Sequence, residues 1–167
     1  MLSDAWIRTY CGPAPGPDDF WFRWNFDPLL LAALSLLFFV VLRARSCHGL
    51  AAVGVLVLAF VSPLCALSSA LFSARVVHHV LLFAVAAPLL ARAWPSRRAG
   101  GAMAAFAVST VVLWGWHLPV AYDLALSHVG VYWLMQISLL GAALWFWRAV
   151  FSPGRTPVEA LTLLIAG

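Results

Sequence analysis

The sequence predicts an all-α integral membrane protein: a bundle of about five membrane-spanning helices with its N-terminus outside the membrane. Of the 167 residues, 64% are hydrophobic and only 10% are charged, whereas a soluble domain carries about 25% charged residues. The mean hydropathy of +0.96 likewise indicates a chain that crosses the membrane several times. All ten basic residues are arginine, and the net charge is +4. In a membrane protein this charge lies in loops beside an anionic leaflet, so we expect the lipid bilayer and no nucleic acid as a partner.

Residues 1–27 are predicted to be a polar N-terminal segment that precedes the transmembrane domain, residues 28–167. The segment lacks the basic-then-apolar pattern of a cleavable signal peptide. It ends in FWFRWNFDP, whose aromatic side chains are typical of a belt at the membrane interface. The first span follows at roughly 28–42 and begins with Pro28, which a first helical turn tolerates.

Four further apolar runs predict spans at roughly 50–71, 76–94, 102–118 and 130–150. Ser62-Pro63 interrupts the second span and Ala87-Pro88 lies within the third, so we expect both helices to bend and to leave room for a cavity near the outer surface. Residues 158–167 begin with a Thr-Pro-x-Glu helix start. They end after about ten residues where about 20 are needed to cross, which predicts a short, half-length or truncated helix.

The arginines predict the orientation of the helices. The segments after spans one, three and five carry seven of them, and the N-terminal segment and the loop after span two carry three. The positive-inside rule therefore places the N-terminus outside and the arginine-rich loops in the cytoplasm.

This topology gathers ionisable side chains and further candidate site residues at the outer face. Span three begins there and span four ends there. The following loop and the first turns of span five lie at the same depth, as does the outer half of span two. The residues concerned are Arg75, His78, His79, Trp116, His117, Asp123, His128, Met135, Gln136 and Cys65. Ionisable groups within a membrane indicate function by default. His78 and His79 should point about 100° apart, so both cannot face one site squarely.

Each of these features also has a purely structural interpretation. Arg75 can be an interfacial side chain whose charge reaches the headgroups. A histidine at this depth can be an anchor or a hydrogen-bonded packing residue. Tyr122-Asp123 is predicted to form a turn that caps the loop. Cys65 can be a small buried residue as readily as a ligand, and Cys11 is predicted to be exposed, with no assigned role.

Several motifs together resemble a known family. FSARVVHHVLLFAVAAPLL, WHLPVAYDLAL, the later GAALWFW and the earlier WNFDP are similar to the multi-span CtaG-like assembly factors of caa-type cytochrome c oxidases. The resemblance extends from Trp24 onward. It implies a multi-pass protein of the bacterial inner membrane that acts as a non-enzymatic chaperone in oxidase assembly. It also implies help with copper delivery at the outer face, with oxidase subunits and periplasmic copper chaperones as partners.

The resemblance assigns individual positions. His79 matches the family's histidine before the apolar run, and His117 matches that of WHLP. Pro119, Tyr122 and Asp123 match the rest of that motif. Arg75 stands where relatives often carry another histidine, and Tyr132, Met135 and Gln136 stand where they often carry a histidine and a Glu-His pair. Relatives are commonly longer.

Copper chemistry suits the residues that are retained. Imidazole binds copper in either oxidation state, and thioether or thiolate sulfur favours Cu(I). His79 and His117 are the expected ligands, with His78, Cys65, Met135 and His128 as further candidates. Two or three such ligands suffice for a transferable Cu(I) ion, whereas the charge of Arg75 would oppose a cation beside it.

Two other classes of protein stay open at this point. A haem-binding membrane protein would use His79 and His117 as axial ligands, although both lie at helix ends. A structural or docking subunit would bind no metal. No acidic residue lies within a predicted span, which argues against a proton-coupled transporter. The absence of a carboxylate–His–nucleophile constellation argues against an enzyme.

Overall fold

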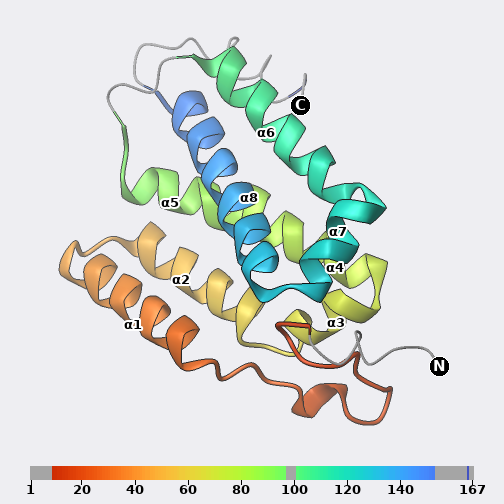
Figure 1. Cartoon of the computed structure of the whole chain (residues 1–167). Helices are drawn as coiled ribbons and strands as arrows, with labels where there is room; N and C mark the ends of the chain where they lie inside the picture. The colour runs from red at the N-terminus through yellow and green to blue at the C-terminus, as the bar shows by residue number, and fades with distance from the viewer. Residues whose placement is uncertain (1–8, 97–100, 153–164, 166–167) are drawn as a thin grey trace.

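The computed structural model describes residues 9–96, 101–152 and 165, and all regular secondary structure within them is helical (Figure 1). The predicted all-α class is confirmed, whereas the expected partial helix at 158–167 falls almost wholly outside the described residues. The elements, in chain order, are η2 (Phe20–Phe22), α1 (Pro28–Arg43), α2 (Cys47–Phe60), α3 (Leu64–Ala70), α4 (Phe72–Val80), η3 (Leu81–Ala86), α5 (Ala87–Ala93), α6 (Ala102–His117), α7 (Pro119–Ser127) and α8 (Val129–Val150).

Two helices of the described chain are long and apolar enough to cross a membrane unaided. They are the continuous run Phe72–Ala93, made of α4, η3 and α5, and Val129–Val150, which is α8. The pairs α2–α3 and α6–α7 raise the number to four if each bent pair is one span. α1 is shorter: its 16 residues reach about 24 Å, against a hydrocarbon core of about 30 Å. The number of five spans therefore stays a prediction.

Prolines and capping residues set the helix boundaries. Asp27 caps α1 by accepting a hydrogen bond from the Leu30 amide at 2.8 Å, directly before Pro28. At Pro63 the chain bends by 48° between α2 and α3, as predicted. Leu118 is extended because a residue before proline avoids the helical region, and Pro119 then starts α7 at 73° to α6.

The bend expected at Pro88 does not break this span: Phe72–Ala93 is one continuous helix, and the π-helical segment η3 ends just before Pro88. Proline has no N–H, so a carbonyl one turn earlier lacks its donor. The Phe83 carbonyl, five residues before Pro88, instead accepts a hydrogen bond from Trp147 Nε1 at 2.7 Å. Trp147 thus joins α8 to the weakened turn.

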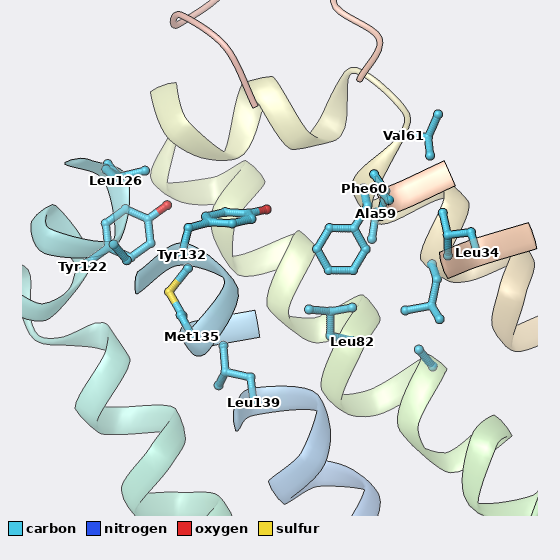
Figure 2. Close-up of a cluster of buried hydrophobic side chains, with 14 residues drawn as sticks. Leu34, Ala59, Phe60, Val61, Leu82, Tyr122, Leu126, Tyr132, Met135 and Leu139 are labelled. Carbon is cyan, nitrogen blue, oxygen red and sulfur yellow. The ribbon is translucent and has the colours of Figure 1, made fainter. Parts of the chain in front are cut away.

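α8 is the central helix of the fold, in contact with α5, η3, α6 and α7, while α1 and α2 pair beside α5 and η3 (Figure 1). The main hydrophobic cluster combines residues of α1, α2, η3, α7 and α8, among them Leu34, Phe60, Leu82, Leu126 and Leu139 (Figure 2). Burial of these apolar side chains holds the helices in register.

The helices alternate in direction, so their ends collect at two opposite regions. We call one the histidine end. It comprises α3, α4, the α6–α7 junction and the start of α8, and the N-terminal segment passes across it (Figure 1). We call the other the arginine end, where Arg43, Arg92 and Arg148 lie in the last turns of α1, α5 and α8.

The N-terminal segment contacts the histidine end through several bonds. Tyr10 stacks on Tyr132 with ring centroids 4.9 Å apart, and burial raises the pKa of Tyr10. The backbone N–H of Asn25 donates to the Val61 carbonyl at 2.9 Å.

Other features of the segment do not involve the histidine end. Arg23 forms an ion pair with Asp19 inside the segment, and the hydrogen bond from Arg23 lowers the pKa of the Asp19 carboxyl. The aromatic side chains just before α1 are exposed, as interfacial anchors are; they are Trp21, Phe22, Trp24 and Phe26.

Candidate functional site

His79 and His117 come together at the histidine end from two different helices. His79 lies in α4 and His117 is the last residue of α6, and their ring centroids are 5.2 Å apart with an interplanar angle of 76°. Both line a cavity of about 220 Å³ whose other walls are almost entirely apolar: Val76, Val80, Phe83, Ala84, Leu113 and Trp114. The two histidines expected to form a pair thus share one cavity.

The ring nitrogens of this pair differ in their surroundings. His117 Nδ1–H donates to the Leu113 carbonyl one turn earlier, at 2.6 Å. Because a carbonyl only accepts, Nδ1 carries a proton, and Nε2 is the ring nitrogen that could bind a ligand. His79 is 5% exposed, and its Nδ1 is buried without a hydrogen-bond partner in the described structure. A buried unpaired nitrogen is costly, and a bound ligand or water would remove that cost.

The ring separation decides whether the pair could share a metal ion. Ring centroids 5.2 Å apart put His79 and His117 close enough for one metal ion to be bonded by both imidazoles, each at about 2 Å. These two residues would hold such an ion in the cavity.

His78 faces away from this cavity. Its ring is 1% exposed, lies 5.1 Å edge-on from Phe60, and is 5.9 Å from the His79 ring. The expected divergence of the two neighbouring histidines is therefore present. Gln136 lies beside His78, yet neither His78 ring nitrogen nor the Gln136 Oε1 completes a hydrogen bond within the described residues.

Arg75 packs against an aromatic ring. Its guanidinium carbon lies 3.3 Å from the centroid of Tyr122, a cation–π contact between α4 and α7. The Tyr122 hydroxyl donates to the Ser68 carbonyl of α3 at 3.1 Å, so this tyrosine joins three helices. The prediction that Tyr122 and Asp123 form a turn is wrong: both lie in α7, because Pro119 restarts the helix.

The remaining predicted site residues lie elsewhere at this end. Asp123 and His128 are exposed, the latter between α7 and α8 rather than in a long loop. Met135 is 1% exposed and belongs to the hydrophobic cluster with Tyr122, Tyr132 and Leu139 (Figure 2). It does not line the histidine cavity.

Cys65 forms a disulfide with Cys11, their Cα atoms 5.4 Å apart. This corrects two expectations, because Cys11 is bonded and half-buried rather than exposed, and Cys65 has no free thiol to offer a metal in this state. The signal that could have found this bond is the predicted topology, which puts both of these cysteines outside and Cys47 inside. Disulfides form in oxidising compartments. Cys47 is free and exposed at the arginine end.

Within the described residues, no group of three or more His, Cys, Asp or Glu side chains could hold a metal ion. The histidine cavity thus offers two protein ligands. Two imidazoles match the low coordination that Cu(I) accepts, and they leave a position for a donor or acceptor partner.

The fold and the histidine end define a helical membrane protein with ionisable side chains gathered at one end of its bundle. Residues 96–166 match the model of a family described as cytochrome c oxidase caa3 assembly factor. This match covers α6, α7 and α8, with His117 and Tyr122, and supports the resemblance to the CtaG-like family over these residues. An assembly-factor family suggests a non-catalytic role. No curated protein and no solved structure matches the chain.

Proposed function

We propose that this protein is a multi-pass inner-membrane factor in the assembly of a cytochrome c oxidase, and that it holds Cu(I) for transfer between His79 and His117. The observation that carries the proposal is the pairing of these two imidazoles, 5.2 Å apart, in one apolar cavity. Oxidase subunits are the proposed clients. Periplasmic copper chaperones are the proposed donors of the ion.

The apolar walls suit a transferable cargo. Few polar atoms compete for the ion, and two neutral ligands bind it weakly enough to release it to a site with more ligands. The Arg75 guanidinium packs on the Tyr122 ring. Its positive charge still acts on His79, so the repulsion expected from the sequence remains, and it favours release of the ion over tight binding.

The disulfide supports an orientation with the histidine end outside. The Cys11–Cys65 bond needs an oxidising compartment, whereas the free Cys47 and the arginines of the opposite end suit the cytoplasm. A membrane-impermeant maleimide applied to intact cells should leave Cys47 unlabelled until the membrane is permeabilised. Labelling in intact cells would overturn this orientation.

Complementation of a deletion strain tests the function. Cells that lack the protein should contain oxidase with a lowered copper content, and the wild-type gene should restore it. His79→Ala and His117→Ala should fail to restore it although the proteins accumulate in the membrane. His48→Ala and His128→Ala, which alter exposed histidines, are matched controls and should succeed. Full copper content in cells that carry either of the first two variants would contradict the proposal.

A further inference from the structure

The Cys11–Cys65 pair lies at the histidine end but takes no part in the histidine cavity. It joins the N-terminal segment to α3 across 54 residues of sequence. Cys65 is fully buried and Cys11 is half-buried, so Cys11 is the member of the pair nearer the surface.

Two hydrogen-bond donors approach these sulfurs. The Tyr132 hydroxyl lies 3.5 Å from Cys11 Sγ and 3.8 Å from Cys65 Sγ, and Asn25 Nδ2 lies 3.9 Å from Cys65 Sγ. A disulfide sulfur is a weak acceptor, whereas a thiolate is charged and binds donors strongly. Tyr132 is almost completely buried, so its hydroxyl needs an acceptor there. These surroundings suit a pair of thiolates better than a disulfide.

The two cysteines are also held together by contacts that do not depend on the disulfide. Tyr10, next to Cys11, stacks on Tyr132 and meets Trp133 edge-on with centroids 5.0 Å apart. The backbone hydrogen bond from the Asn25 N–H to the Val61 carbonyl holds the N-terminal segment to the end of α2 at a second point. Reduction would therefore leave the two sulfurs close to each other.

We propose that Cys11 and Cys65 are a reversible dithiol–disulfide couple whose reduced form is a second Cu(I) site. The inference rests on the proposed function only in taking copper as the ion. Two thiolates are soft ligands that select Cu(I). The site exists only after reduction, because the disulfide offers no thiolate.

The chemistry balances with a dithiol reductant at the outer face. A thiolate of the reductant attacks one sulfur, the Cys11–Cys65 bond breaks, and the second reductant thiol resolves the mixed disulfide. Two electrons and two protons pass to the cysteines, and the reductant becomes a disulfide. Cu(I) then binds both sulfurs and displaces their two protons.

Cu(I) titration of the detergent-purified full chain tests this inference, with a chromophoric Cu(I) chelator as competitor. The oxidised protein is compared with protein reduced by a phosphine and desalted without oxygen. Reduction should add one equivalent of tightly bound Cu(I). The gain should persist in Cys47→Ser, the matched control, and disappear in the Cys11→Ser/Cys65→Ser double variant.

Reduced wild-type protein alkylated at its thiols provides a second route should the double variant not fold, and alkylation should abolish the gain. No gain on reduction, a gain that survives alkylation, or a gain that depends on Cys47 would overturn the inference. The histidine site is measured separately in the oxidised protein. Copper bound only after reduction would refute the histidine site and support the dithiol site. Copper bound equally before and after reduction would support the histidine site and refute the dithiol site.

Discussion

Loss of the Cys11–Cys65 bond should destabilise the folded chain substantially. The bond closes a loop between residues 54 apart in the sequence, which contains α1 and α2. A cross-link of this kind stabilises mainly by restricting the unfolded chain, and the effect grows with the logarithm of loop length.

The expected loss follows from that length. For a fully unfolded loop of 54 residues, the chain-entropy relation gives about 4 kcal/mol at 25 °C. In detergent, α1 and α2 can stay helical after unfolding. Excluding their 16 and 14 residues leaves 24 free residues and about 3.5 kcal/mol. The stabilisation depends on the logarithm of the loop length, so the values for the fully unfolded loop and for the loop with helical α1 and α2 are nearly the same.

Unfolding by sodium dodecyl sulfate in mixed micelles measures this loss, with the fluorescence of the nine tryptophans as the signal. Oxidised Cys47→Ser protein is compared with the same protein after reduction and alkylation. Cys11→Ser and Cys65→Ser should each lower the free energy of unfolding by the same amount. The double variant should lower it no further, because a single bond is lost.

Two results would refute this reasoning. A loss below about 1 kcal/mol would mean that the bond does not restrict the unfolded chain as the entropy relation requires. Additive losses in the two single variants would mean that each sulfur acts through separate contacts rather than through one bond.

Two further substitutions test the packing of the bundle. Gly49→Ala places a Cβ 2.7 Å from the Val41 side chain and should cost about 1–3 kcal/mol by overpacking, whereas Gly54→Ala on the same helix meets nothing within 4 Å and should gain up to about 1 kcal/mol. Equal effects of the two in the same unfolding assay would contradict the close approach of α1 and α2. Trp147→Phe should cost about 1–3 kcal/mol because a carbonyl near the π-helical turn loses its donor. Trp145→Phe, at a more exposed ring, should change stability little, and an equal loss in both would show that the indole hydrogen bond is not the cause.

Much of the fold could be predicted from hydropathy and proline positions. The five apolar runs correspond to the helices, and Pro63 marks the break between α2 and α3 as expected. The π-helical segment before Pro88 could not be predicted, because it depends on a donor from Trp147 on another helix. Helix α7 was missed because the nine residues from Pro119 are too few to span a membrane and follow the break at Leu118-Pro119, while its buried side chains find partners on α3 and α8.

The candidate site could also be predicted from the sequence only in part. Topology alone places His79 and His117 at one depth, and the structure adds that they share a cavity. Sequence spacing indicates that His78 diverges from His79 but cannot show that Met135 is a core residue. Predicting the disulfide would have taken one further inference from the arginine pattern. Of the three cysteines, Cys11 and Cys65 are the two that this pattern predicts to lie in the oxidising compartment, where disulfides form.

The measurement that tests the central claim most directly is the Cu(I) stoichiometry of the oxidised, detergent-purified protein, read together with its visible absorption spectrum. Wild type and His48→Ala should bind one Cu(I) ion, His79→Ala and His117→Ala should bind none tightly, and no spectrum should show a haem Soret band. Full Cu(I) binding by either cavity variant, or a Soret band that either substitution removes, would contradict a Cu(I) site between His79 and His117.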